Sequence, residues 1–327
     1  MEQGEPEARA VEARIRRIED ADLPACAAVF YDSFFALYDA HNLPRIPRSD
    51  ERMIAIFRHL LKTDPELCWL GEREASGAPA RVVGFGMAMA RGRTAFLSFL
   101  FVDPSAQAGG LGRALFERCL ALDGEPRRDG VETLATCIDS IQPISTGLYA
   151  RYGLLPRVPL FALTGSLRPG ALPALPAVVS ATPFSELAAD ARSDARLLDE
   201  LGRLDREVVG YARPTEHGIW RAAQRQGFLY RHDAAGPPLA YGYAQTSGRL
   251  GPVCSRQAEL LAPILAHLTS AVRPVEGWAT MVAGPTGSVL VPLLQGGMRL
   301  DGQPGIYCSN GASPDFDRYI PASFGLL

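Results

Sequence analysis

The chain has 327 residues, enough for two ordinary domains, and with 47% hydrophobic and 21% charged residues its composition is globular. Its net charge is −3, and neither half carries the basic stripe that binds nucleic acid or an anionic membrane. The acidic N-terminus lacks an apolar signal segment, and no apolar stretch approaches the ~18–20 residues of a membrane helix. We therefore expect a cytoplasmic protein with no nucleic-acid or membrane partner.

Cysteine and lysine usage adds little functional signal. The six cysteines are far apart and form no C-x-x-C pair, as expected of small buried hydrophobic residues in a reduced compartment. Lys62 is the only lysine, which suggests a GC-rich, bacterial genome, so clusters of arginine are not taken as sites. No metal-ligand spacing and no Ser-His-Asp or G-x-S-x-G pattern is present, and we expect no metal.

The first 165 residues alternate helices and strands, as in an α/β (α+β) domain. In chain order we predict a strand at 12–18, a helix through 23–34, a loop at 42–48, a helix capped by Ser49, strands at 68–72, 81–89 and 94–102, a helix at 111–122, a strand at 133–138, a helix at 143–152 and a strand pair within 154–163. Ser76, Gly77 and Pro79 predict a hairpin turn. The strand at 94–102 is apolar on both faces, which is typical of a central strand.

A stretch rich in Pro, Gly and Ala at 165–179 has no periodicity and is the best linker candidate. Beyond it the order of elements repeats: Phe85-Gly86-Met87-Ala88 has an echo in Tyr241-Gly242-Tyr243-Ala244, and Gly153-Leu154 has one in Gly297-Met298. We therefore predict two copies of one α/β unit, with domains at 1–165 and 177–327 and a linker at 166–176.

The most informative stretch runs from Val102 to Gly112, between the apolar strand and an amphipathic helix. Its glycines let a phosphate approach the backbone, and the helix N-terminus directs free N–H groups to the same place. A dinucleotide fingerprint needs a glycine where Leu115 stands, and a Walker loop needs a Gly-Lys-Ser/Thr that is missing. Alone, the loop is as compatible with a plain strand–helix turn as with an anion site.

Two motifs in order resemble those of the GNAT acyltransferase superfamily. The first, V-x-P-x-x-[RQ]-x-x-G-x-[GA], is matched by Val102, Pro104, Gln107, Gly110 and Gly112. The second, N-x-x-A-x-x-l-Y-x-x-x-G-F, is matched at the same spacing by a segment with three mild departures: Gln142 for Asn, Ser145 for Ala and Leu154 for Phe. The resemblance covers roughly residues 12–165 and implies two tandem GNAT-like domains, each a mixed central sheet flanked by helices.

The resemblance implies an acetyl-CoA site. The pyrophosphate would lie on the backbone N–H groups of Gln107, Ala108, Gly109, Gly110, Leu111 and Gly112. Pantetheine would run beside Phe101 and Val102, where a backbone N–H would bind the thioester oxygen, and Gln142 would touch the pantetheine arm. Tyr149 would be the general acid for the departing thiolate, with a core tyrosine as the alternative interpretation and Tyr152 as a neighbour more typical of the core.

The general base is less defined. Asp139, at the carboxyl end of its strand, and Ser98 are suitably placed polar side chains, although Asp139 is equally suited to cap the next helix. His41 and His59 are further candidates, but lone histidines on a loop or a helix face are usually structural.

The second half resembles the accessory domain of tandem GNAT proteins through LDREVVGYAR, AYGYAQ and GRLGPV. The place of its Gly-rich loop reads Cys254 to Leu260 without a glycine, and Leu293 stands where Tyr149 would be. We therefore expect this copy to shield the thioester and to form a wall of the acceptor pocket, not to bind CoA or catalyse. Asp205 and Arg206 are interpreted as an ion pair on a helix.

The function expected is acetyl-CoA-dependent N-acetyltransfer to a primary amine of a small molecule or peptide, by direct attack on the thioester. The alternative is a non-catalytic acyl-CoA-binding sensor, and O- or S-acyl transfer stays open. The expected oligomeric state is a monomer or a homodimer.

The last residues turn apolar after a polar stretch, at Tyr319, Ile320, Phe324, Leu326 and Leu327. We expect this tail to pack against the rest of the protein. By resemblance to some tandem GNAT proteins, the alternative is that the carboxylate of Leu327 supplies the base.

Overall fold

The computed structural model describes residues 13–75, 78–122, 130–233 and 236–327. The chain forms two compact units, each described by itself. Unit 1 comprises the described residues of 1–89 and 97–129, and unit 2 those of 90–96 and 130–327.

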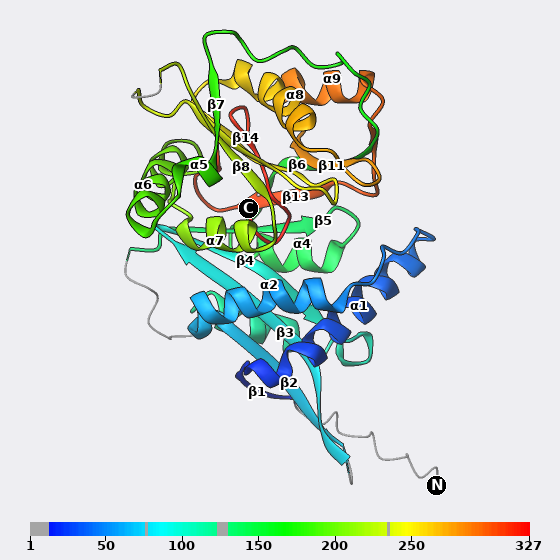
Figure 1. The fold of residues 1–327 in the computed structure, drawn as a ribbon. Coiled ribbons are helices and arrows are strands. Elements are labelled where there is room, and N and C mark those ends of the chain that lie inside the picture. The colour runs from blue at the N-terminus through cyan, green and yellow to red at the C-terminus, as the bar shows by residue number, and fades with distance from the viewer. Residues whose placement is uncertain (1–12, 76–77, 123–129, 234–235) are drawn as a thin grey trace, which may run out of the picture. The chain divides into compact units, whose positions relative to one another are not determined.

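Unit 1 is a sheet with helices on both faces (Figure 1). Its strands are neighbours in the order β1 (Arg14–Arg17), β2 (Cys68–Ala75), β3 (Ala78–Arg91) and β4 (Thr94–Val102), the last running from residues of unit 2 into unit 1. The helices are α1 (Leu23–Ala40), α2 (Asp50–Thr63) and α3 (Leu111–Cys119). On one face α2 packs through Phe57, whose ring centroid lies 5.1 Å from that of Phe85 and 4.9 Å from that of Phe99.

Glycines seat α3 on the opposite face of this sheet. A Cβ added at Gly71 would lie 2.7 Å from Leu111 Cδ1, and one at Gly86 would lie 2.6 Å from Cys119 Sγ. Such distances are far below ordinary contact, so only glycine allows the helix to approach this closely. This close packing of α3 on the sheet fixes the position of its first residue, Leu111, and therefore the position where the Gly-rich loop ends.

Unit 2 contains a sheet that combines strands from both halves of the chain. Its order is β5 (Thr133–Asp139), β13 (Gly305–Ser309), β6 (Leu155–Gly165) and β11 (Trp278–Ala283), with β12 (Arg299–Leu300) also on β6. β13 is antiparallel to both neighbours, with Tyr307 opposite Cys137 and Val158. The predicted strand pair within 154–163 is therefore wrong: that segment is one strand, and its partner comes from the end of the chain.

The rest of unit 2 is an antiparallel sheet with its own helices. Its strands follow the order β14 (Tyr319–Ile320), β10 (Leu250–Ser255), β9 (Ala240–Ala244), β8 (Gln226–Arg231) and β7 (Ser180–Pro183). The helices of unit 2 are α4 (Pro143–Ala150), α5 (Phe184–Leu187), α6 (Ala191–Val208), α7 (Pro214–Ala222), α8 (Leu261–Ala271) and α9 (Gly287–Gln295). Short 3-10 turns occupy Asp20–Asp22, Pro65–Leu67, Pro104–Ala106 and Ala258–Leu260 along the chain.

The two copies share local details as well as element order. Gly242 on β9 faces Ile264 and Leu268 of α8, as Gly86 on β3 faces Cys119 of α3. Gly153 after α4 and Gly297 after α9 both have positive φ, 79° and 111°. These matches and the helix-flanked sheets confirm the predicted α/β fold with two copies of one unit.

Several predicted boundaries need correction. The helix predicted to reach residue 122 ends at Cys119, because Ala121 adopts a left-handed conformation with φ of 48°. The helix predicted to reach 152 ends at Ala150. Ser49 precedes α2, but its side chain makes no cap bond, and its N–H instead donates to the Tyr31 hydroxyl at 2.7 Å.

Other predictions meet the structure only in part. β2 and β3 form the predicted hairpin, while Ser76 and Gly77 lie outside the described residues. The domain and linker boundaries remain predictions, and Leu172 within the predicted linker is buried in the core of unit 2. The apolar tail packs as predicted at Tyr319, Ile320, Leu326 and Leu327, whereas Phe324 is exposed. The Tyr211 hydroxyl donates a hydrogen bond to Leu327 O at 3.4 Å. The alternative role of the Leu327 carboxylate as general base stays a prediction.

Candidate functional site

The Gly-rich loop joins β4 to α3 within unit 1. It leaves β4 at Asp103, makes a 3-10 turn at Pro104–Ala106, and enters α3 at Leu111. Ala108 and Gly110 have positive φ, 67° and 82°, so the backbone turns sharply twice just before the helix. From Gln107 to Gly110 every residue is exposed.

This loop has the form of an anion cradle. The first backbone bond into α3 runs from Ala114 N to Gly110 O, so the N–H groups of Leu111, Gly112 and Arg113 precede the helical ladder. A Cβ built at Gly110 would meet nothing within 4 Å, and one at Gly109 would touch only Ala106 O at 4.0 Å. Side chains at these glycines would therefore extend into the space that a phosphate needs.

Asp103 fixes the start of the loop. Its carboxylate accepts from Ser105 N at 2.9 Å and from the Arg81 guanidinium at 2.6 Å. Burial raises the pKa of Asp103, but the hydrogen bonds from Ser105 and the charge of Arg81 outweigh burial and hold that pKa below its usual value. The carboxylate is thus committed to holding the turn and does not point to an acid–base role.

At the end of β4, side chains bind the carbonyl of Val102, and the N–H of Val102 lies on the edge of the strand away from β3. Its carbonyl accepts from Ser33 Oγ at 2.9 Å and from Gln107 Nε2 at 3.0 Å. Asp103 N donates to Val83 O of β3 at 2.9 Å. Because successive N–H groups of an extended strand point to opposite edges, the N–H of Val102 faces away from β3. A backbone donor at this edge is what the resemblance requires for a thioester oxygen.

The predicted residues of the second motif lie in unit 2, at the turn from β5 into α4. Gln142 is the N-cap of α4, and its Oε1 accepts from Ile144 N at 3.3 Å. Asp139 Oδ1 accepts from Ile141 N at 3.2 Å, in the turn before the helix, so Gln142 and not Asp139 caps α4. Tyr149, near the end of α4, is buried, and Tyr152 beyond the helix is half-buried.

The other base candidates have structural surroundings. Ser98 on β4 has a buried hydroxyl without a hydrogen-bond partner among the described residues. His41 caps the end of α1, with its Nδ1 2.9 Å from Leu37 O. His59 lies half-buried on α2. None of these observations singles out a base.

The cysteines are poor nucleophiles. No disulfide joins any of the six, all of which lie in the described part of the chain. Burial raises the pKa of Cys26 to about 12 and that of Cys308 to about 11, and it also raises the pKa values of Cys68, Cys119, Cys137 and Cys254. These thiols stay protonated near neutral pH, so an acyl-cysteine route is disfavoured.

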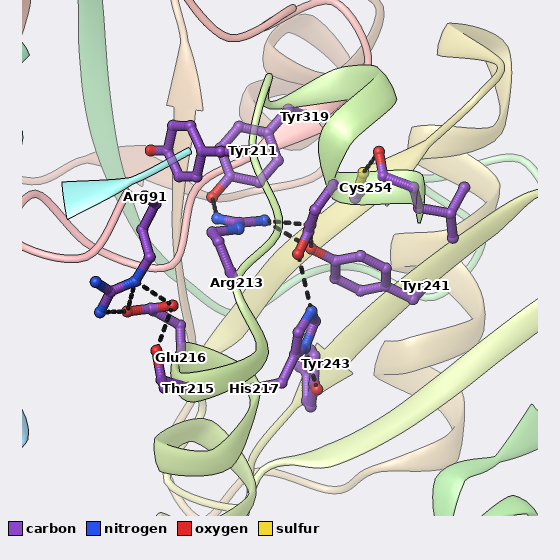
Figure 2. A network of polar contacts seen from close by, with 12 residues as sticks. Arg91, Tyr211, Arg213, Thr215, Glu216, His217, Tyr241, Tyr243, Cys254 and Tyr319 are labelled. Carbon is purple, nitrogen blue, oxygen red and sulfur yellow. Dashed lines mark hydrogen bonds and ion pairs between the residues drawn. The ribbon is translucent and has the colours of Figure 1, made fainter. Parts of the chain in front are cut away.

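A second polar cluster is completely buried in unit 2 (Figure 2). The Arg213 guanidinium donates to Asp205 Oδ1 at 2.8 Å and to the hydroxyls of Tyr241 and Tyr319. His217 bridges Asp205 Oδ2, 3.0 Å from its Nε2, and the Tyr243 hydroxyl, 2.7 Å from its Nδ1. We call these six residues the buried network.

The electrostatics of the buried network are internally balanced. Burial raises the pKa of Asp205, but the positive Arg213 and the contact with His217 outweigh burial and hold that pKa well below its usual value. All six side chains have zero relative exposure, and they come from α6, the segment before α7, α7, β9 and β14. A substrate has no access to them, so the network is structural.

Beside the network, an ion pair ties the β3–β4 hairpin to α7. Arg91 donates to both carboxylate oxygens of Glu216, with Nη2 2.6 Å from Oε1, as the left side of Figure 2 shows. The Arg91 side chain is 10% exposed and that of Glu216 is fully buried. A Cβ at Gly92 would lie 3.2 Å from Tyr211 Cβ, so the hairpin tip packs closely on the same region.

The sequence did not reveal this network. Asp205 was expected to pair with Arg206, but neighbours on a helix point in different directions, and its partners are Arg213 and His217. The available signals were the stretches 204–213 and 240–245, which carry Asp205, Arg213, Tyr241 and Tyr243. Nothing in their spacing predicts that they meet.

The second copy lacks the loop that marks the first. β10 ends at Ser255, and a 3-10 turn at Ala258–Leu260 leads directly into α8 at Leu261. The Ser255 side chain closes this turn by donating to Gln257 O and accepting from Gln257 N. No exposed glycine segment separates strand from helix here.

The described residues contain neither a membrane-spanning helix nor a cluster of metal ligands. No helix there has the length and apolar character to span a bilayer. Within the same ranges, no three His, Cys, Asp or Glu residues gather as metal ligands would.

Comparison with known proteins gives a family match within the first half of the chain. Residues 33–154 match the model of the acetyltransferase (GNAT) family. The chain matches no curated protein sequence.

Among solved structures, three similar folds span nearly the whole chain. A putative acetyltransferase from Pyrococcus horikoshii has 14% identity and a TM-score of 0.72, with 100% of both chains covered. A GCN5-related N-acetyltransferase from Sphaerobacter thermophilus has 15% identity and a TM-score of 0.60, covering 93% of this chain and 98% of that one. A tandem GNAT protein from the clavulanic acid biosynthesis pathway has 18% identity and a TM-score of 0.53, covering 92% and 100%. Residues 33–154 therefore carry the domain of the acetyltransferase (GNAT) family, a family that transfers acyl groups from acyl-CoA, and the fold of the chain is similar to those of the three structures above.

Proposed function

We propose that this protein is an acetyl-CoA-dependent N-acetyltransferase that moves an acetyl group to a primary amine by direct attack on the thioester. The observation that carries the proposal is the exposed loop from Gln107 to Gly110, whose glycines and adjoining helix N-terminus leave room and N–H donors for a pyrophosphate. Its family membership supplies the acyl-CoA chemistry.

In this proposal, the backbone N–H groups from Gln107 to Gly112 bind the pyrophosphate. The pantetheine arm follows the end of β4 beside Phe101 and Val102, and Gln142 contacts the same arm by family resemblance. The N–H of Val102 is favoured for the thioester oxygen because it lies on the edge of β4 away from β3. A donor placed on a developing oxyanion contributes about 3 kcal/mol to transition-state stabilisation.

The chemical step needs few side chains. The deprotonated nitrogen of the acceptor attacks the thioester carbon, the new C–N bond forms, and the C–S bond then breaks. The thiolate leaves with the electron pair of that bond and receives a proton from the Tyr149 hydroxyl. Asp139 is the proposed base that takes the proton from the acceptor nitrogen, through water.

Direct transfer is favoured over a covalent intermediate. The pKa values of all six cysteines are raised by burial, so none supplies a thiolate at neutral pH. The acceptor we propose is the amine of a small molecule or peptide in the cytoplasm, and the protein acts as a monomer or homodimer.

The competing function is a sensor that binds acyl-CoA without turning it over. The Tyr149 position favours an enzyme, since a sensor has no use for an acid at the leaving group. Incubation with acetyl-CoA and a panel of amines tests this. The proposal expects amine-dependent release of free CoA thiol, matched by N-acetylated product in mass spectrometry. Tight binding without thiol release from any amine would favour the sensor, and release only with alcohols or thiols would favour O- or S-transfer.

A further inference from the structure

A row of aromatic rings begins at the end of β4 and continues along α1 in unit 1. The centroids of Phe101 and Phe30 lie 4.7 Å apart, those of Phe30 and Phe34 5.8 Å, and those of Phe34 and Tyr38 4.2 Å. Phe30 and Tyr38 are buried, whereas Phe34 and Phe101 are half-buried. We call these four residues the aromatic row.

The aromatic row starts at the proposed reaction centre. Ser33, next to Phe34 on α1, donates through its hydroxyl to the carbonyl of Val102 at 2.9 Å. Val102 is the residue whose N–H is assigned to the thioester oxygen. The carbon skeleton of an amine that attacks there would extend beside Phe101 or along α1, where Phe34 is half-buried.

Two ion pairs lie beside α1. In the loop after α1, Arg45 binds Asp39 at 2.8 Å, and Arg48 binds Asp50 at 2.8 Å. The hydrogen bond from Arg45 lowers the pKa of Asp39 and so keeps this carboxylate ionised in its pair. The charges of Arg45 and Arg48 are therefore engaged by carboxylates of their own.

We propose, on the basis of the proposed function, that the acceptor is a primary amine carrying an aromatic or bulky aliphatic body, and that Phe34 and Phe101 determine this specificity. Paired aromatic rings commonly add about two- to tenfold in affinity beyond the effect of apolar burial. Since the body packs on the row while the nitrogen reacts, the preference acts on kcat/KM.

The experiment compares 2-phenylethylamine with ethanolamine and spermidine as acceptors of the wild-type protein. We expect kcat/KM for 2-phenylethylamine to exceed that of both polar amines by about tenfold or more. Phe34→Ala should lower kcat/KM about tenfold for 2-phenylethylamine and less than about twofold for ethanolamine. Phe35→Ala is the matched control: Phe35 is also half-buried on α1, but it faces Tyr31 and Arg45.

A competition experiment with the wild-type protein tests the same inference without any variant, so its result does not depend on whether a variant folds. 2-Phenylethanol has the same body without the amine, so it should compete with 2-phenylethylamine, whereas ethanol at the same concentration should not. Equal or higher kcat/KM for the polar amines, or no competition by 2-phenylethanol, would overturn the inference and leave the transferase function standing. No thiol release with any amine, despite acetyl-CoA binding, would overturn the proposed function and this inference together.

Discussion

Tyr149 and Leu293 occupy the same position in the two copies of the repeat. In the first copy Leu154 N donates to Tyr149 O at 3.1 Å, and in the second Met298 N donates to Leu293 O at 3.0 Å. The glycine that follows each helix turn has positive φ in both copies. The same backbone thus carries a hydroxyl in one copy and an apolar group in the other, in line with catalysis by the first copy alone.

Replacing Tyr149 with Phe tests this difference. We expect acetyl-CoA affinity to stay within about twofold while kcat falls about 10²–10³-fold, because only the proton for the leaving thiolate is lost. A thiol with pKa ~8.5 is a fair leaving group even unaided, so activity should not vanish. Steady-state thiol release and calorimetry measure the two quantities.

Tyr152→Phe is the control for this variant, since Tyr152 is a half-buried tyrosine just beyond the same helix. It should turn over like the wild type. A Tyr149→Phe variant with wild-type kcat on an accepted amine would mean that the acid is another group.

At the residue scale, local motifs were predictable and distant partners were not. Gly110 and Gly112 could be found because the turn chemistry, strand end and helix start lie within a dozen residues. The bond from Ser49 N to Tyr31 OH could not, because it depends on how α1 and α2 pack. The meeting of Asp205 with Arg213, Tyr241 and Tyr319 depends likewise on tertiary packing.

Among the elements, the buried network connects α6, α7, β9 and β14. Asp205→Asn should lower the free energy of unfolding by about 3–5 kcal/mol, because it leaves the buried charge of Arg213 without its counter-ion. Asp199→Asn is the control: Asp199 lies on the same helix in an exposed pair with Arg203 and should cost less than about 1 kcal/mol. Urea unfolding measures both. Equal losses for the two variants would contradict a stabilising role of the network.

The pKa of Asp205 sets the pH range of this contribution. A folded-state pKa below the ordinary ~3.9 means that stabilisation is complete above that value and is lost as the pH falls through the folded pKa. The stability difference between wild type and Asp205→Asn should therefore be constant from about pH 7 to about pH 5 and shrink only below about pH 4. Urea unfolding across this range checks the sign, and a difference that shrinks between pH 7 and pH 5 would contradict it.

Element type was predictable where the pattern was strong. The apolar run at 94–102 forms β4 with those bounds, and the helix start at Leu111 is also as predicted. The prediction of a strand pair within 154–163 was wrong because the strand there, β6, pairs with β13, which lies about 140 residues further along the chain. No local pattern in Gly305–Ser309 encodes that insertion.

For the whole molecule, the insertion of β13 between β5 and β6 makes the halves interdependent. A fragment ending at Gly165 would leave facing edges of β5 and β6 without their partner, and we expect it to be insoluble or unfolded alone. Co-expression with residues 166–327 should recover soluble protein, measured by size-exclusion chromatography and circular dichroism. A fragment 1–165 that folds cooperatively and binds acetyl-CoA alone would contradict this expectation.

Acetyl-CoA binding tests the role of the exposed glycine loop most directly. Calorimetric titration of the full chain should give one site per chain, because only the first copy has the exposed glycine loop. Gly110→Glu should weaken binding about 100-fold or more, by placing a carboxylate where the pyrophosphate lies. Gly170→Glu is the control, since Gly170 also has positive φ, 73°, and open space around its Cβ. One site lost only in Gly110→Glu supports the account, whereas two equivalent sites, or binding unchanged in Gly110→Glu, would contradict it.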